Sequence, residues 1–203
     1  MFFSSVFAEL NKYKVDMSRL LPSNFEGDRY GLHFRLVNEG DAGFIFQLRS
    51  NKTLSKYIHD IKGDVNNQRE WIKKYKQREE DGTDYYFIFF KNDIPVGLNR
   101  IYSIHDKTYT SGSWVMASGS SIDTVMAIPI IIREIAFDTL GMDFEDNYDA
   151  CHVDNKKVIK FNLKFGCKIY KHFQDVKGEY VAMSLTKEDF ESNKPNLLKL
   201  IGY

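Results

Sequence analysis

Histidine, cysteine and serine are the side chains of this sequence best suited to act as nucleophiles, bases or metal ligands. The five histidines include no pair one helical turn apart, a spacing common in metal sites. Cys151 and His152 are adjacent on an expected strand, so their side chains point to opposite faces and make a poor metal pair. The serine-rich run Ser118–Ser121 lacks the G-x-S-x-G spacing of a nucleophile elbow. The spacing therefore favours neither a metal site nor a covalent nucleophile.

The segment from 109 to 167 carries a different chemical signal. It consists of an expected strand, a loop rich in serine that includes Gly119, an apolar helix ending at Leu140–Gly141, a strand and a final helix over 155–165. A loop that opens a helix can direct several free backbone N–H groups at an anion. Each such interaction contributes only ~0.3 to 1 kcal/mol, so several must converge.

Hydrophobic periodicity and turn residues predict the elements that position this segment. Expected strands cover 32–37, 84–90, 94–104, 108–116, 148–153, 167–176 and 179–185, and expected helices cover 6–21, 42–49 and 66–80 besides the two above. Pro129 predicts a kinked first turn in the apolar helix, or a helix start nearer Met126. A meander combined with two strand–helix crossovers predicts an α/β fold with a mixed, mostly antiparallel central sheet flanked by helices on both faces.

Composition narrows the class of protein. The 203 residues carry 28 basic and 28 acidic side chains, which argues against a nucleic-acid-binding protein or a polybasic membrane protein. Two cysteines cannot form a disulfide framework, and the longest apolar run, Val125 to Ile132, is too short to cross a bilayer. We expect a cytoplasmic protein with an N-terminal helical appendage at 1–28 and one domain at 29–203.

Two motifs resemble those of the GNAT superfamily of acyl-CoA-dependent N-acetyltransferases. The last helix of that family reads approximately Asn-x-x-Ala/Ser-x-x-Phe/Leu-Tyr/Leu-x-Lys-x-Gly-Phe, and here Asn155, Phe161, Lys164 and Gly166 occupy the corresponding places. Upstream, Ile135-Ala-Phe-Asp-Thr-Leu-Gly141 is similar to the end of the family's main helix, at the customary distance.

The resemblance implies acetyl-CoA as co-substrate and no metal. In the family, the strand before the phosphate loop and the strand after the main helix splay apart to hold the pantetheine arm. The residues expected to bind the co-substrate are therefore Trp114, Val115, Met116, Ser118, Gly119, Ser120, Ser121, Ile122, Asp123, Thr124, Asn155, Phe161 and Lys164.

Three places depart from the family pattern. The phosphate loop, Arg/Gln-x-x-Gly-x-Gly/Ala in the family, aligns with Ser120–Val125, which lacks both glycines and places the carboxylate of Asp123 near the expected phosphates. The position of the usual tyrosine acid holds Asn162, and the position of a glutamate base holds Ala150. His152 shares a face with Ala150 if the strand is regularly pleated, so it is the candidate for proton relay to water, with a hydrogen-bonded histidine at a strand end as the alternative.

The expected reaction is direct transfer of an acetyl group from acetyl-CoA to a primary amine in a ternary complex. The chain is similar overall to acetyltransferases of bacterial surface-sugar pathways, which implies an amino sugar or nucleotide-linked amino sugar as acceptor; protein N-termini are the second choice. We expect a small-molecule amine partner, with neither nucleic acid nor membrane, and leave a homodimer open. Two other classes remain: a non-catalytic GNAT-like module that binds a ligand or partner, and a structural domain.

Overall fold

A computed structural model describes residues 20–54, 57, 61–176 and 178–203, without the side chains of residues 149 and 150. The helix expected at 6–21 lies almost wholly outside this part of the chain. The boundary expected between residues 28 and 29 falls inside the first described strand, which pairs with the next one.

One sheet of eight strands forms the centre of the described fold, in the order β1-β2-β3-β4-β5-β6-β8-β7. Its strands are β1 (Glu26–Arg29), β2 (Leu32–Leu36), β3 (Asp84–Lys91), β4 (Ile94–His105), β5 (Thr108–Met116), β6 (Phe144–His152), β7 (Lys168–Asp175) and β8 (Gly178–Thr186). Neighbouring strands pair antiparallel except β5 and β6, which are parallel. This confirms the mixed, mostly antiparallel sheet that the sequence predicted.

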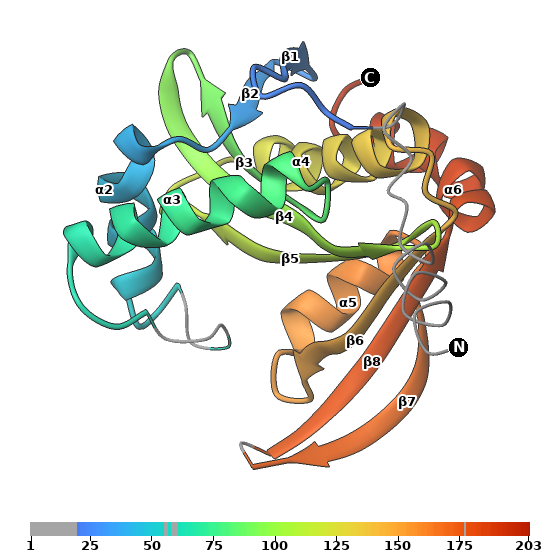
Figure 1. Cartoon of the computed structure of the whole chain (residues 1–203). Coiled ribbons are helices and arrows are strands. Elements are labelled where there is room, and N and C mark those ends of the chain that lie inside the picture. The colour runs from blue at the N-terminus through green and yellow to red at the C-terminus, as the bar shows by residue number, and fades with distance from the viewer. Residues whose placement is uncertain (1–19, 55–56, 58–60, 177) are drawn as a thin grey trace, which may run out of the picture.

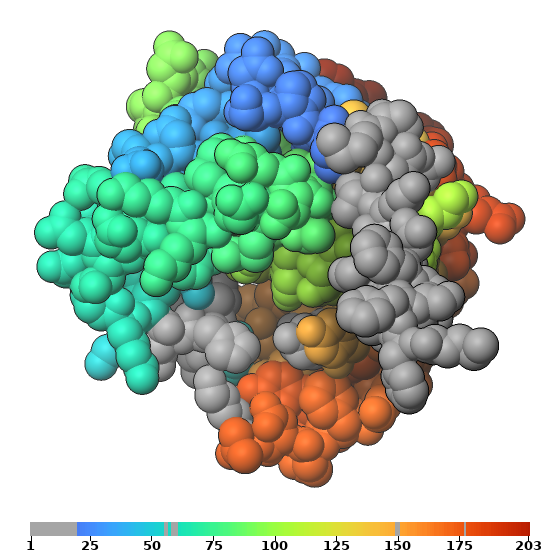
Figure 2. Space-filling view, viewed as in Figure 1, coloured from blue at the N-terminus to red at the C-terminus, as the bar shows by residue number. Residues whose placement is uncertain are grey.

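Helices cover both faces of the sheet (Figure 1). The described helical segments are η3 (Glu39–Asp41), α2 (Ala42–Ser50), α3 (Val65–Glu80), α4 (Ile122–Glu134), η4 (Ile135–Thr139), α5 (Lys156–Lys164) and α6 (Lys187–Leu200). The helices α2 and α3 bury one face, and α4, η4 and α6 bury the other, where α5 joins the same apolar cluster. Figure 2 shows one face of the molecule, with α3 (teal to green) at the left and the β7–β8 hairpin (orange) at the bottom.

The strand β3 shows why helices are needed on both faces. Tyr85, Phe87 and Phe89 alternate with Tyr86 and Ile88, and all five side chains are buried. The first three belong to the apolar cluster of α4, and the other two belong to the cluster of α2 and α3. Successive side chains of a strand point to opposite faces, so an uninterrupted apolar strand requires cover on both.

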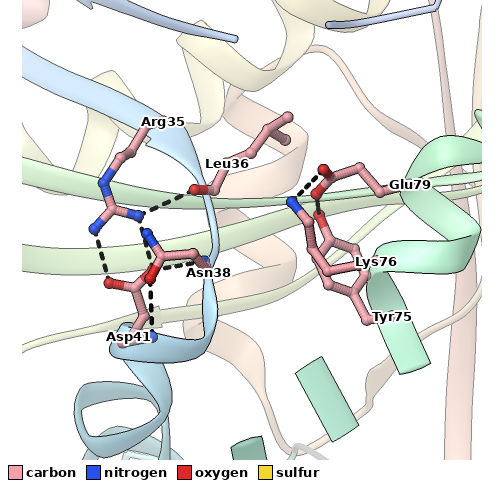
Figure 3. A network of polar contacts seen from close by, with 8 residues as sticks. Arg35, Leu36, Asn38, Asp41, Tyr75, Lys76 and Glu79 are labelled. Carbon is pink, nitrogen blue, oxygen red and sulfur yellow. Dashed lines mark hydrogen bonds and ion pairs between the residues drawn. The ribbon is translucent and has the colours of Figure 1, made fainter. Parts of the chain in front are cut away.

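Polar side chains fix the turn before α2 against the sheet (Figure 3). The guanidinium of Arg35 donates two hydrogen bonds to the carboxylate of Asp41, at 2.7 and 2.8 Å. Asn38 and Asp41 form a reciprocal capping box, the arrangement that satisfies free N–H groups at a helix start. On α3, the hydroxyl of Tyr75 donates to Glu79 and accepts a hydrogen bond from the backbone N–H of Tyr86 at 2.8 Å.

The structure differs from the sequence-based elements in four places. The helix α4 begins at Ile122 and continues through Pro129, so the expected start nearer Met126 is wrong. Proline at this depth costs one backbone hydrogen bond, and burial of nearly the whole helix compensates. The strands β1 and the first half of β6, and the helix α6, had no counterpart in the sequence prediction. The helix α6 contains Pro195, and the hydrophobic periodicity of its sequence is too weak to predict a helix.

Candidate active site at the β5–β6 opening

The two parallel strands at the centre of the sheet separate almost as soon as they meet. The only Cα pairs between β5 and β6 in the described register are Thr108↔Phe144 and Tyr109↔Glu145. Beyond them, the hydroxyl of Thr110 donates to the carbonyl of Asp146 at 2.8 Å, and side-chain atoms then replace backbone atoms in the bridge. The two strands therefore diverge toward the end of β5 and leave a wedge between them. Along this wedge, the backbone edge of each strand faces a gap and has no neighbouring strand among the described residues to pair with.

Irregularities in both strands produce this opening. In the register of β4 with β5, Leu98 pairs with Val115 and Arg100 with Gly112, so β5 holds one extra residue. Ser113 lies in this bulge with a left-handed φ of 51°. On the other side, β6 carries two extra residues against β8 between Asn147 and Cys151. A bulge bends its strand and re-aims the side chains around it, so each strand turns away from the other.

Asn147 bridges the strands at the point where they part. Its Oδ1 accepts the backbone N–H of Ser111 at 3.0 Å, and its Nδ2 donates to the carboxylate of Glu145 at 2.6 Å. The side chain thus takes the place of the next backbone pair in the ladder. It links the two strands at the narrow end of the wedge.

A cavity of about 160 Å³ occupies this wedge. Its walls come from β5, β6, α4 and α5, with Tyr57 and β4 completing them. The lining residues are Tyr57, Asn99, Ser111, Gly112, Ser113, Trp114, Pro129, Arg133, Glu145, Asn147, Cys151, Asn155, Val158, Phe161 and Asn162.

A buried ion pair forms one wall of the cavity. Arg133 donates to both carboxylate oxygens of Glu145, at 2.9 and 3.0 Å, and both side chains are at least 97% buried. The hydroxyl of Tyr109 donates to the same carboxylate at 2.9 Å. Burial and the neighbouring Glu145 raise the pKa of Tyr109 well above its ordinary value, so the phenol stays protonated. The charges of this wall balance, which leaves the pair without a free charge for catalysis.

The helix α5 supplies the opposite wall. Phe161 packs against Trp114 with ring centroids 4.6 Å apart. Asn155 is the N-cap residue of α5, yet its side chain makes no capping hydrogen bond and lines the cavity. Asn162, at the family's tyrosine position, also lines the cavity and lies 4.0 Å from the sulfur of Cys151. The structure thus brings together three of the residues that the sequence analysis singled out for the co-substrate.

His152 lies at the end of β6, outside the set of residues that line the cavity. Its ring is stacked on Tyr57 at 5.7 Å and meets Tyr180 edge-on at 5.1 Å. Its Nδ1 accepts the backbone N–H of Asp154 at 3.1 Å, so the other ring nitrogen carries the proton when the ring is neutral. Tyr57, which stacks on the ring, also lines the cavity.

The Ser/Gly loop leads directly from β5 into α4. Its residues Ser118 and Gly119 are exposed, and Gly119 has a left-handed φ of 84°. Ser121 is the N-cap residue of α4, and its side chain makes no capping hydrogen bond to the helix backbone. The N–H groups of the first turn are therefore not capped by Ser121. The hydroxyls of Ser121 and Thr124 bond to each other at 3.0 Å.

The remaining predicted residues lie away from the cavity. Val115 points to the opposite face of the sheet and is buried in the cluster of α2 and α3. Met116 packs against the other core cluster, and Lys164 is exposed in the last turn of α5. Val115 and Met116 can contribute through their backbone at the edge of β5, whereas the side chain of Lys164 does not reach this cavity.

Several residues of the site were not predicted from the sequence. Arg133 and Glu145 line the cavity, as do Asn99 and Asn147. Lys91, at the end of β3, reaches the first turn of α4. The one available signal was Arg133, a charge within an otherwise apolar helix, because a charge buried in such a place must be paired.

Two negative findings concern the described residues alone. No helix in that part of the chain is long and apolar enough to cross a membrane. Nor do its histidine, cysteine, aspartate and glutamate side chains gather in any group of three or more that could hold a metal ion.

The family assignment follows from comparison with known proteins. The model of the acetyltransferase (GNAT) domain matches residues 32–168, about two thirds of the chain. The chain therefore belongs to the GNAT acetyltransferase family, as its two helix motifs indicated. A comparison with curated proteins finds no match.

Solved structures of GNAT proteins share the fold. Apo FdhC, described as a nucleotide-linked sugar GNAT, is 31% identical over 88% of this chain and 99% of its own, with a TM-score of 0.72. The spermidine N-acetyltransferase of Vibrio cholerae, solved with CoA and spermine, is 15% identical over 80% of this chain and 99% of its own, with a TM-score of 0.67. RimJ of Mycobacterium smegmatis, solved with CoA-disulfide, is 14% identical over 84% of this chain and 89% of its own, with a TM-score of 0.70.

Proposed function

We propose that this protein transfers an acetyl group from acetyl-CoA to the primary amine of a nucleotide-linked amino sugar. The observation that supports acetyl transfer is the wedge between β5 and β6. The two strands separate after two residue pairs, and the wedge holds a cavity lined by Trp114, Asn155 and Phe161. The observation that favours this acceptor is the 31% identity to a nucleotide-linked sugar GNAT over nearly its whole length.

The wedge suits the pantetheine arm of the co-substrate. Pantetheine carries two amide groups, which pair with exposed strand edges as another strand would. The apolar wall of Trp114 and Phe161 accommodates the methylene groups and the thioester. The first turn of α4, at the end of β5, then faces the pyrophosphate.

The transfer itself requires few protein groups. The amine nitrogen attacks the thioester carbonyl carbon, so a C–N bond forms while the carbonyl electrons move to oxygen. The tetrahedral intermediate collapses, the C–S bond breaks, and the thiolate leaves with the electron pair. Water accepts the proton lost by nitrogen, and the thiolate takes a proton from water. Positioning of the two reactants supplies a large part of the rate in such a step, which is consistent with asparagine at position 162.

Charge balance favours a neutral or anionic acceptor over a polyamine. The acid in the wedge, Glu145, is already paired with Arg133. A second cavity of about 240 Å³, between α2 and α3, is lined by Arg49, Lys62 and one acid, Asp64. The carboxylate of Asp64 caps α3. Among the described residues that line these two cavities, a polycation such as spermidine would find no surplus of carboxylates.

The second cavity also offers hydrogen-bond donors. Gln68 lines it and is 6% exposed, and its Nε2 has no partner among the described residues. An unpaired buried amide donor is costly, so it favours a ligand that brings an acceptor oxygen. The diphosphate or base of a nucleotide-linked sugar brings such oxygens, whereas a polyamine brings donors alone.

Turnover of an amine panel tests the proposal. Purified protein is mixed with acetyl-CoA and a nucleotide-linked amino sugar, the free amino sugar, spermidine or a peptide with a free N-terminus, and thiol release is followed. We expect the nucleotide-linked sugar to give the highest kcat/KM. Preference for the peptide would reassign the acceptor to protein N-termini. Thermal stabilisation by acetyl-CoA without turnover of any amine would favour a non-catalytic binding module.

A further inference from the structure

The first turn of α4 holds an ion pair that links it to a distant strand. The ammonium of Lys91, the last residue of β3, lies 3.0 Å from Oδ2 of Asp123, 3.1 Å from the hydroxyl of Thr124 and 3.3 Å from that of Ser121. Ser121 and Lys91 hold the pKa of Asp123 at about 2, so its carboxylate is charged at neutral pH. One cation therefore joins three side chains of the loop and first turn.

Lys91 neutralises the negative charge of Asp123 in a loop that would otherwise repel phosphates. Residues 117–126 contain no lysine or arginine, and Asp123 is their one charged residue. A carboxylate at a helix start occupies the favourable end of the helix dipole, the same place that a phosphate would take. With Lys91 beside it, the cluster is neutral; without Lys91, it would carry one negative charge toward an incoming pyrophosphate.

The pair is also accessible enough to change partners. The side chains of Lys91 and Asp123 are 39% and 46% exposed, so water reaches both. Exposed ion pairs of this kind contribute little to stability. A pyrophosphate, which carries more charge than one carboxylate, can therefore share or take over the ammonium at small cost.

We propose that Lys91 is the cation that binds the pyrophosphate of CoA, and that Asp123 orients Lys91 while lowering the affinity for the phosphates. This assignment rests on the proposed function, since it names the residue that compensates for the absent basic and glycine positions of the family's loop. It makes two variants act in opposite directions. Removal of the cation weakens binding, and removal of the carboxylate strengthens it.

The test measures affinity for three ligands by isothermal titration calorimetry. CoA carries the pyrophosphate and a 3′-phosphate, dephospho-CoA keeps the pyrophosphate alone, and pantetheine lacks both. We expect Lys91→Gln to weaken CoA and dephospho-CoA by the same factor, about tenfold or more, because a charge-assisted contact is lost. Asp123→Asn should tighten both by a few fold. Pantetheine affinity should change by less than about twofold in either variant.

A matched control comes from an ion pair of the same type elsewhere. Lys107 and Asp143 lie 2.8 Å apart, are similarly exposed, and sit at the opposite end of β5 from the loop. Lys107→Gln should leave the affinity for all three ligands unchanged. The dependence of CoA affinity on salt should be smaller in Lys91→Gln than in Lys107→Gln, because fewer charges are neutralised on binding.

Four outcomes would overturn the assignment. Equal weakening of CoA and pantetheine by Lys91→Gln would mean that Lys91 only supports the loop, and unchanged CoA affinity would mean that it makes no contact. Weaker CoA binding by Asp123→Asn would mean that the carboxylate holds the loop in its binding shape. A wild-type protein that binds neither CoA nor pantetheine would overturn the proposed function itself, and this assignment with it.

Discussion

At the scale of single residues, substitutions of Asn155 distinguish a role in ligand binding from a role in helix capping. Asparagine is a favoured N-cap residue, but here its side chain makes no capping bond and lines the cavity. The position is therefore free of the capping role that its sequence context suggests. The same residue belongs to the helix motif, and we propose that its side chain contacts the co-substrate.

We predict that Asn155→Ala leaves stability nearly unchanged and weakens CoA by about tenfold, the effect of one lost hydrogen bond. Urea unfolding and calorimetry with CoA measure the two effects. Asn155→Asp, which keeps the shape but loses the amide donor, should weaken CoA at least as much. A loss of about 1 kcal/mol or more in the free energy of unfolding, with normal CoA affinity, would show that Asn155 acts as a cap.

His152 is the second residue with a testable role. Its ring packs between Tyr57 and Tyr180, and it is not among the cavity's lining residues. We predict that His152→Ala lowers kcat by no more than ~10²-fold, the low end of acid–base contributions, since water can carry the protons. Steady-state kinetics and CoA titration measure this. A near-complete loss of turnover in a folded variant with normal CoA affinity would identify His152 as the general base.

At the scale of secondary-structure elements, the bulge in β5 determines the shape of the site. Ser113 adopts a left-handed conformation there, which glycine accepts readily and β-branched residues resist. The residues after it, Trp114 and Val115, point to opposite faces, one into the cavity and one into the α2–α3 core.

We predict that Ser113→Gly keeps both stability and turnover, while Ser113→Val loses roughly 1 to 3 kcal/mol of stability through backbone strain. If the bulge shifts to accommodate the valine side chain, Trp114 moves and turnover falls more than CoA affinity. Chemical denaturation and kinetics of the pair provide the comparison. Equal stability of the two variants would mean that the bulge is not strained.

At the scale of the whole molecule, buried protonated groups make stability depend on alkaline pH. Burial raises the pKa of the Cys167 thiol from an ordinary value of 9.0 to about 12, although Arg133 lies 3.7 Å from its sulfur and lowers it. The pKa of Tyr109 is likewise raised. The unfolded chain ionises these groups near their ordinary values, so above pH 9 the folded protein binds more protons than the unfolded one.

The resulting prediction concerns the free energy of unfolding between pH 8 and about 11. A folded pKa above the unfolded one gives stability that is complete below the unfolded value and declines as the pH rises past it. Stability should therefore fall above pH 9, by at most ~1.4 kcal/mol per pH unit for each group. Cys167→Ala should be less stable at pH 8 but show a shallower decline. Equal slopes for the two proteins, measured by urea unfolding under reducing conditions, would contradict the assignment.

The sequence by itself determined the local elements and the family. The strand at 84–90, the turns at 92–93 and 106–107, and the helix end at Gly141 follow from a run of aromatic and β-branched residues and from turn chemistry, which are local properties. The spacing from Asn155 to Gly166 carried the GNAT resemblance. Where the periodicity was interrupted at Pro129, the expected helix start nearer Met126 was wrong, and α6, whose periodicity is weak, was not predicted.

Only the tertiary structure decided how the site is built. Lys91 reaches Asp123 across 32 residues, and Tyr109 reaches Glu145 across 36. The residues within each pair belong to different elements, so no local period relates them. Their contact depends on strand order, on the register of β5 with β6 and on the bulge at Ser113. These features depend on non-local packing, because a register shift of one residue would turn every side chain of a strand to the other face.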